Sequence, residues 1–401
     1  MKVNKWTFGL AAAGLVSLPV GSQADEKLNP MLTAVTPTTV SGYINTSIHW
    51  TPGTGNRVVP NHGQNTPNKQ DGFNLNVVDL ALEKPLDEAQ WAAGYKAELL
   101  FGQDANIYAT QSPTAVGPAD FGIKQAYLAL RAPVGNGLDF KVGVWDTITG
   151  YEVFNAGSNP NYTRSYSWTI EPTTFTGVLA TYQLCKFASA SAGIANTYGP
   201  AINGRANVPG AKAESYKTYL AGLFLTAPDD WGFLGGSAFY ATFHNGYNSG
   251  FAGGADQTSY FVGATVNTPL KWLKVGACYD YLGTTSDFGD SSYANAYTLY
   301  SSIQIPDSKF SLHLRGEYAN SDTAVLGSGA NLPGGNSEVF ATTATLQYDL
   351  WQNVLSRLEF RWDHQAGDND MTGYGGDLAK PASTNGKRNS YLLALNLIYK
   401  F

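Results

Sequence analysis

The last eleven residues of the chain carry an apolar side chain at every second position: Tyr391, Leu393, Leu395, Leu397, Tyr399 and Phe401. Successive residues of a β-strand point to opposite faces, so this pattern describes one strand with an apolar face that runs to the terminus. A closed barrel in lipid requires such a strand, because its last strand pairs with its first and its outer face meets hydrocarbon. The C-terminus therefore predicts the closing strand of a transmembrane β-barrel.

The N-terminus has the three parts of a secretory signal peptide. Lys2 and Lys5 give a positive start, an apolar run follows from Trp6 to Val16, and Ser22 and Ala24 supply the small residues of a cleavage site. A membrane anchor is the alternative, but the run is too short to span a bilayer and Pro19 interrupts it. We expect residues 1–24 to be a cleaved signal peptide that exports the protein.

The rest of the chain then divides into two parts. Residues 25–36 form a short N-terminal segment, and residues 37–401 are expected to form the transmembrane barrel. The chain has 25 basic and 31 acidic residues, and cleavage removes two of the lysines. An acidic protein is a poor partner for the phosphate backbone, so we expect no nucleic-acid partner.

Composition agrees with a membrane barrel rather than a helical membrane protein. No second stretch approaches the roughly 18 to 20 apolar residues of a membrane helix. Aromatic residues make up 13% of the chain, and it has 44 glycines and 24 tyrosines. Half of each barrel strand is polar, and Trp and Tyr gather at the membrane interfaces, which suits this composition.

Long polar connections alternate with short turns along the whole chain. The long ones lie near residues 51–72, 103–120, 146–174, 197–215, 245–257, 283–292, 320–337 and 365–388. The short ones lie near 85–88, 133–137, 185–189, 228–232, 268–271, 306–309 and 349–353, and they are rich in Pro, Gly, Asn and Asp. This arrangement predicts an all-β, antiparallel up-and-down barrel of about 16 strands, with short periplasmic turns and long outer loops. Small shifts in the boundaries would change the count to 14 or 18.

Several strands can be oriented from their charges. Near residues 310–320 and 355–364, apolar side chains alternate with charged ones, and residues 91–101 and 40–50 repeat the pattern with polar partners. A charge on the lipid face costs about 2–4 kcal/mol at the midplane, so the charged faces are expected to point inward to a polar lumen. Residues 73–84 break the alternation, which suggests a bulge or a change of face.

The inward charges give the candidate channel lining. It comprises Lys96, Glu98, Arg131, Asp139, Lys141, Arg315, Glu317, Arg357, Glu359, Arg361 and Asp363. A barrel of this size is wide enough for an aqueous channel whose lining charges select solutes. The alternative role, compatible with the first, is a ladder of salt bridges between strands. Six basic against five acidic residues leave the charge selectivity open.

The third of the long connections, at about 146–174, is longer than a connector needs to be. Its aromatic residues, which include Tyr151, Tyr162 and Tyr166, argue against disorder. One hypothesis is that this loop folds into the barrel and narrows the channel, with Glu152 and Arg164 near the constriction. The other is that it forms an ordered cap on the outer rim.

Two sets of residues resemble known proteins. The ending with Tyr399 and Phe401 is similar to the C-terminal signature of bacterial outer-membrane proteins, which implies recognition by the barrel insertion machinery. Residues 124–143, 146–153, 161–166 and 175–178, with 83–95 upstream, resemble the OmpL-like outer-membrane β-barrel porin family. The resemblance covers nearly all of the mature chain and implies a porin in the outer membrane of a Gram-negative-type bacterium.

The function expected from these features is passive diffusion of small hydrophilic solutes or ions through a water-filled channel, without a cofactor and among outer-membrane lipids. No catalytic motif surrounds the five histidines, so no enzyme is expected. A non-conducting adhesin or structural barrel, a barrel enzyme and a soluble β protein are the alternatives. Porins commonly form homotrimers, but no sequence feature here demonstrates one.

No metal site is expected. Residues 368–373 carry carboxylates at positions 1 and 3 and glycine at position 6, as in a calcium loop. Position 12 is Ala379, where such a loop needs a bidentate glutamate, so a solvated surface loop is favoured. Cys185 and Cys278 are the only cysteines and match no metal spacing.

Overall fold

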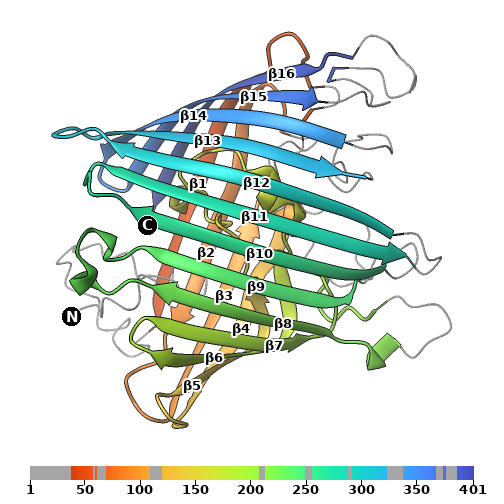
Figure 1. Ribbon diagram of the computed structural model, residues 1–401, viewed down its shortest axis with the longest axis vertical. Helices are drawn as coiled ribbons and strands as arrows, with labels where there is room; N and C mark the ends of the chain where they lie inside the picture. Colours follow the sequence, from red (N-terminus) through yellow and green to blue (C-terminus); the bar gives the residue numbers. More distant parts are fainter. Residues whose placement is uncertain are drawn as a thin grey trace.

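A computed structural model shows sixteen antiparallel strands that close into one barrel (Figure 1). The structure describes residues 38–56, 59–60, 69–108, 120–206, 213–248, 255–286, 291–322, 337–366, 374–375 and 386–401. The predicted signal peptide, the segment 25–36 and the calcium-like segment 368–373 lie outside these residues. The predicted barrel architecture and the count of sixteen strands are confirmed.

The strands follow one another around the barrel in sequence order. They are β1 Thr39–Trp50, β2 Gly72–Lys84, β3 Ala92–Phe101, β4 Phe121–Ala132, β5 Leu138–Asp146, β6 Thr174–Cys185, β7 Ala188–Ala195, β8 Thr218–Thr226, β9 Ala238–Tyr247, β10 Ala255–Asn267, β11 Leu273–Ser286, β12 Ser291–Gln304, β13 Phe310–Ser321, β14 Ser337–Trp351, β15 Val354–Ala366 and β16 Asn389–Lys400. The helices are short: α3 Ala105–Tyr108, η1 Ala156–Ser158, α4 Tyr166–Ile170, η2 Ala213–Ser215 and η3 Asp229–Leu234. No helix in the described part of the chain has the length and apolar character needed to cross a membrane.

The barrel closes between its first and last strands. β16 pairs with β1, with Leu395 opposite Ile48 and Tyr399 opposite Ile44. The closure continues one residue beyond β16, where Gly42 and Phe401 exchange two backbone hydrogen bonds of 3.0 Å. The C-terminal strand therefore occupies the closing position predicted from its alternation.

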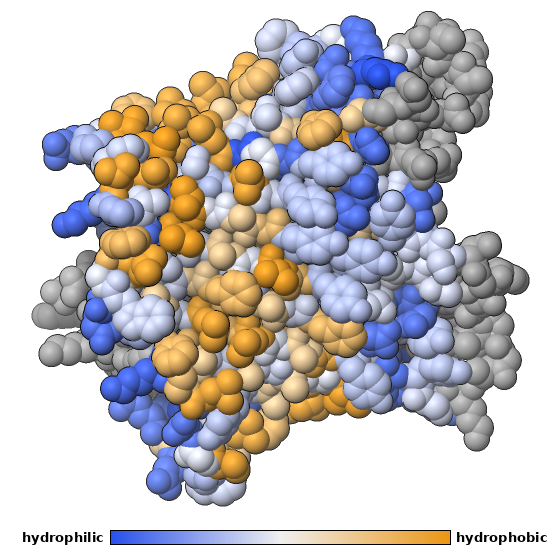
Figure 2. All heavy atoms as spheres, viewed as in Figure 1, coloured by the Kyte–Doolittle hydropathy of each residue, from blue (hydrophilic) through white to orange (hydrophobic). Residues whose placement is uncertain are grey.

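The outer face of the barrel is apolar and aromatic, as the lipid interior requires. In β15, Leu358 and Phe360 are 48% and 47% exposed, whereas Arg357, Glu359 and Arg361 are buried. Figure 2 shows apolar side chains, in orange, gathered on the left and centre of the visible outer face. Light blue side chains of intermediate hydropathy form a band beside them, toward the right. Exposed tyrosines of the outer face include Tyr219, Tyr260, Tyr293, Tyr297 and Tyr399. Rings of this kind sit at membrane interfaces.

The irregular segment 73–84 contains a bulge. β1 and β2 pair with a register shift after Asn45, because Val77 faces Asn45 while Leu75 faces Thr46. The skipped residue, Asn76, is fully buried and donates to the Asn45 side chain at 3.0 Å. A bulge moves side chains from one face to the other, so it accounts for the broken alternation in the sequence.

The inner wall is divided, so the expected polar lumen is charged over only part of its circumference. Charged residues are buried in β2 to β4, β11, β13 and β15, but the buried residues described in β6 to β10 include no Asp, Glu, Lys or Arg. There, apolar and aromatic residues pack into one cluster with residues of β5, β11, β12 and the segment after β5: Trp145, Ile148, Phe175, Leu179, Ala195, Leu220, Phe224, Tyr240, Phe261, Cys278 and Tyr300. The inner faces of β6 to β10 are thus built from apolar residues and from polar ones such as Ser191, Thr242 and Ser259, so only part of the lumen is charged.

Candidate functional site in the barrel lumen

The segment 147–173 between β5 and β6, called loop 3 here, lies inside the barrel. In Figure 1 it is the olive segment whose short helix α4 lies behind β11 and β12. Tyr162 is fully buried, and Arg164 and Tyr166 are each 1% exposed. Contacts of α4 with β11, β12 and β13 place this part of the loop against the inner wall.

Local capping builds the two short helices of loop 3. The Asn155 side chain accepts from the Gly157 N–H at the start of η1, and Ser165 accepts from the Trp168 N–H at the start of α4. Asn and Ser are favoured at helix starts because their oxygens satisfy N–H groups that the first turn leaves free. Asn159 also bonds the backbone of Val153 in both directions. The loop is therefore ordered by its own side chains.

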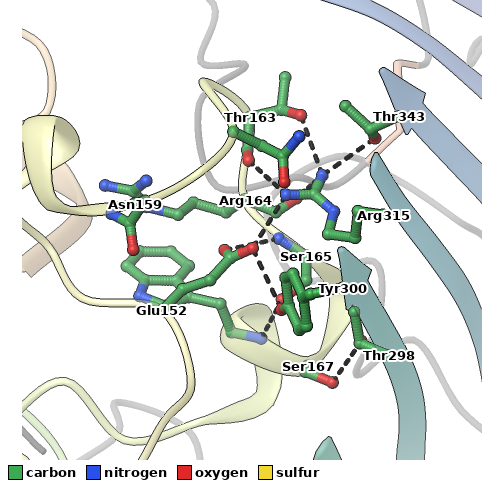
Figure 3. Close-up of polar contacts among 12 residues, drawn as sticks. Glu152, Asn159, Thr163, Arg164, Ser165, Ser167, Thr298, Tyr300, Arg315 and Thr343 are labelled. Atoms are coloured by element: carbon green, nitrogen blue, oxygen red, sulfur yellow. Dashed lines mark hydrogen bonds and ion pairs between the residues drawn. The ribbon is translucent and has the colours of Figure 1, made fainter. Parts of the chain in front are cut away.

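Arg315 of β13 is the main contact between the wall and loop 3 (Figure 3). Its guanidinium lies 2.9 Å from Glu152 and 2.6 Å from Glu317, and it donates to the Thr163 carbonyl at 2.6 Å. The Arg315 side chain is fully buried. The Arg164 carbonyl also accepts from Arg315, at 3.2 Å, and from Arg361 of β15, at 2.7 Å. Two wall arginines thus bind one turn of the loop backbone.

Wall carboxylates bind the loop's backbone donors. Glu359 of β15 accepts from the Tyr162 N–H at 2.6 Å and from the Thr163 N–H at 2.9 Å. Glu317 of β13 accepts from the Tyr166 N–H at 2.7 Å. Hydrogen bonds to ionised groups are shorter and stronger than neutral ones, so these contacts hold the loop firmly.

Arg357 of β15 and Lys400 at the end of β16 bind the other half of the loop. Arg357 donates to the carbonyl oxygens of Ala156, Asn159 and Asn161 at 3.0 Å each. Lys400 donates to the Gly157 carbonyl at 3.0 Å. The alternating charges of β15 therefore act mainly on loop 3. Arg361 also reaches across to β13, where it lies 3.4 Å from Glu317.

The predicted aromatic residues of the loop anchor it at separate points. The Tyr162 hydroxyl lies 2.6 Å from His49 Nε2 and donates to Ser47 of β1 at 3.0 Å. The Tyr166 hydroxyl donates to Asp363 of β15 at 2.9 Å.

Tyr151 anchors the loop on another side. Its ring stacks on Tyr300 of β12 with centroids 3.9 Å apart. The ring also occupies the space above Gly276 of β11, where a Cβ would collide with it.

A second charged cluster lies on the opposite wall. Glu98 of β3 lies 3.0 Å from Lys96 and 2.8 Å from Lys124 of β4, and Lys124 also pairs with Asp146 at 2.8 Å. Lys124 was missing from the predicted lining. A register shift after Glu98 in the pairing of β3 with β4 buries both Lys124 and Gln125, which simple alternation places on opposite faces.

Three predicted lining residues lie apart from loop 3. Arg131 of β4 pairs with Asp139 of β5 at 2.6 Å beside the 133–137 turn, and both are partly exposed. The Lys141 ammonium lies over the Tyr127 ring, 4.8 Å from its centroid.

Loop 3 starts at β5 and reaches β13 and β15, so it crosses the lumen, and it also packs toward β1, β2 and β3. Phe154 and Trp168 belong to one buried cluster with Tyr43, Val77 and Leu100 of those strands. The Lys124 ammonium lies over the Phe154 ring, 5.6 Å from its centroid. The charged wall of β13 to β15 and the wall of β1 to β3 are thus both in contact with one loop.

A group of carboxylates lies where loop 3 returns to the wall. Glu171 is partly buried and close to Asp280 and Glu152, so burial first and the charge of Asp280 next raise the pKa of Glu171 well above its ordinary value. A cavity of about 30 Å³ beside it is lined by Asp146, Glu152 and Glu171 together with other residues of loop 3, such as Phe154 and Trp168. That volume suits about one or two water molecules.

The predicted insertion residues lie on the outside of the barrel. Tyr399 and Phe401 are each 49% exposed. The Phe401 ring lies against Gly42 of β1, where a Cβ would approach it to 2.8 Å.

The family of the chain follows from comparison with known proteins. The family model described as "Putative beta-barrel porin-2, OmpL-like" matches residues 37–401. The chain belongs to this family. The protein is therefore an OmpL-like outer-membrane β-barrel of the porin type, as its fold also indicates. No curated protein matches the sequence of this porin.

Solved porin structures share the fold at low sequence identity. The anion-selective porin from Comamonas acidovorans has a TM-score of 0.58 and 13% identity, and the match covers 91% of this chain and 99% of that one. The outer membrane channel DcaP of Acinetobacter baumannii has a TM-score of 0.58 and 14% identity, with 91% and 97% covered. OmpT of Vibrio cholerae in its trimer form has a TM-score of 0.55 and 13% identity, with 91% and 99% covered.

Proposed function

We propose that this porin allows passive diffusion of small hydrophilic solutes or ions across the outer membrane, and that loop 3 forms the narrowest part of the route. One observation carries the proposal: loop 3 lies in the lumen, and Arg315, Arg357 and Arg361 hold its backbone there. A loop held in this way limits the size of the solutes that pass. The charged side chains on the two facing walls would select among them.

The same packing favours a second candidate function. Phe154 and Trp168 contact the wall of β1 to β3, so loop 3 bridges the barrel. A barrel closed in this way would not conduct, and it would act as an adhesin or structural protein. We infer no covalent chemistry for either function, and neither requires a cofactor.

Location and assembly complete the proposal. A cleaved signal peptide at residues 1–24 would export the chain, and the insertion machinery of a Gram-negative-type cell would recognise its C-terminus. The trimer form of OmpT, a protein with the same fold, supports a homotrimer here. Cross-linking of the protein in native outer membranes would test the oligomer independently of conduction.

Single-channel current from the purified mature protein in a planar bilayer tests the function. Discrete conductance steps, with a conductance that rises with salt concentration, are expected for a porin. A folded barrel that inserts without conducting would support the structural role instead. Heat-modifiable migration in electrophoresis gives the control for folding.

A further inference from the structure

Three cations meet one stretch of loop 3 without a carboxylate partner. Arg164 donates to the Phe154 carbonyl at 2.6 Å, Arg357 binds the carbonyls of residues 156, 159 and 161, and Lys400 binds the Gly157 carbonyl. Among the described residues, none of the three has a carboxylate oxygen within 4.0 Å. Carbonyl oxygens satisfy hydrogen bonds, but they do not neutralise a charge.

The carboxylate that acts on Arg357 is already engaged. Glu359 acts electrostatically on Arg357, but its two oxygens accept from the Tyr162 N–H, the Thr163 N–H and the Thr345 hydroxyl. A buried charge is unfavourable unless it is paired. This stretch of loop 3 therefore has an excess of positive charge.

Arg164 also has hydrogen-bond donors to spare. Among the described residues, its Nε and Nη1 have no acceptor, although Arg164 is only 1% exposed. An unsatisfied buried donor is costly, and more so when it is charged. Most buried polar groups in proteins are satisfied, so an exception of this kind marks a place where an acceptor from outside the protein can bind.

The Arg164 side chain points away from the wall that holds its backbone. Its carbonyl oxygen accepts from Arg315 and Arg361, while the guanidinium extends in the other direction (Figure 3). It lies over the Trp168 ring, 5.6 Å from the centroid. Lys69 is near enough for the two positive charges to interact, but Lys69 is already paired with Asp104.

We propose that Arg164 is an anion-binding site in the lumen, which takes a small oxyanion such as a carboxylate or inorganic phosphate. The anion supplies acceptors for Nε and Nη1. It also supplies a counter-charge for Arg164, Arg357 and Lys400. A neutral sugar offers acceptors without the counter-charge, and a metal cation offers neither. The guanidinium turns from Trp168 toward the lumen to meet the anion. The role of this site in passage rests on the proposed function.

Two measurements on the full mature protein test the site. The first is binding of inorganic phosphate, and separately of acetate, to the protein in detergent by calorimetry. The second is the reversal potential across a bilayer under a potassium chloride gradient, with and without added phosphate. Arg164→Gln removes the positive charge and two of the three donor nitrogens. Arg131→Gln is the matched control, because Arg131 is paired with Asp139 away from loop 3.

Wild type is expected to bind at least one of the two anions and to favour anions in the reversal potential. Arg164→Gln should weaken binding by about tenfold or more, the scale of one charge-assisted hydrogen bond, while Arg131→Gln leaves it unchanged. Absence of binding in wild type overturns the site, and so does equal binding by a folded Arg164→Gln. If that variant does not fold, the wild-type titration still decides.

The two proposals fail in different ways. A wild-type barrel that binds phosphate but carries no current disproves the channel and leaves the anion site intact. A conducting barrel that binds neither anion, and whose reversal potential does not change with Arg164→Gln, disproves the anion site and leaves the channel intact.

Discussion

The Arg315 guanidinium of β13 lies 2.9 Å from the Glu152 carboxylate of loop 3, and neither side chain is more than 1% exposed. Glu152 also accepts from the Ser165 N–H at 2.9 Å, so the pair connects the wall to both arms of the loop. This one ion pair therefore fixes both arms of loop 3 to the barrel wall.

Replacing Arg315 should release the loop. Arg315→Met leaves Glu152 and Glu317 buried without their main partner, and removal of one member of a buried ion pair costs about 3–5 kcal/mol. Loop contacts are lost before barrel pairing, because the strands are held by their own backbone hydrogen bonds. We expect a larger single-channel conductance with more current noise, and faster cleavage of loop 3 by protease.

Arg131→Met is the control for this prediction, because it removes an arginine of the inner face that touches no residue of loop 3 in the described contacts. Unchanged conductance and unchanged protease cleavage in a folded Arg315→Met would show that the loop does not depend on this contact.

A glycine of the wall makes room for the loop. Tyr151 lies over Gly276 of β11, where an added Cβ would collide with the ring, and it stacks on Tyr300. Gly276→Val should displace Tyr151 at a cost of about 1–3 kcal/mol, the usual range for overpacking. The expected readout is altered conductance with a lower thermal midpoint of the folded barrel.

Gly316 of β13 gives the matched control, because a Cβ there meets no atom within 4 Å. A Gly316→Val variant should keep the conductance of wild type. Equal effects of the two substitutions would mean that valine disturbs the strands and not the contact with Tyr151.

The sequence predicted the charged part of the wall well and the apolar part badly. In β13 and β15, charged residues alternate with apolar ones, and a charge cannot face lipid, so the inner face is unambiguous. In β8 to β10, Leu220, Phe224 and Phe261 face inward while apolar residues also face lipid. Alternation carries no signal when both faces are apolar.

The contacts of loop 3 were beyond the reach of sequence pattern for a different reason. Glu359 and Tyr162 are 197 residues apart, and their hydrogen bond depends on where the closed barrel brings β15. Aromatic composition indicated that the loop was ordered, but not which wall it would contact. Lys124 was missed because a bulge, which has no sequence signature here, shifts the face of β4.

Acid should strengthen the contact between Glu171 and Asp280. Burial and the neighbouring carboxylates raise the pKa of Glu171 in the folded protein. An acid with a raised folded pKa binds its proton more tightly when folded. Its stabilising effect is therefore complete at low pH and is lost as pH rises above about 4.3, the ordinary glutamate value, toward the raised pKa.

The thermal midpoint of the detergent-solubilised barrel should therefore fall as pH rises through this range. Glu171→Gln imitates the protonated acid and should flatten that dependence, with higher stability than wild type at alkaline pH. Glu88→Gln, in the exposed turn before β3, should follow wild type. Parallel pH profiles for wild type and Glu171→Gln would contradict the prediction.

We expect the terminal Phe401 to have a second role, marking the chain for insertion, which is separable from its place in the closure of the barrel. Its backbone exchanges two hydrogen bonds with Gly42, and its ring packs on the same glycine. Phe401→Ala keeps the backbone bonds, whereas deletion of Phe401 removes them. Deletion should therefore slow folding into detergent micelles more than Phe401→Ala does.

If the ring is the insertion signal, Phe401→Ala should fold in vitro at nearly the wild-type yield and yet accumulate poorly in the outer membrane of cells. Normal accumulation of Phe401→Ala in cells would restrict the residue to barrel closure.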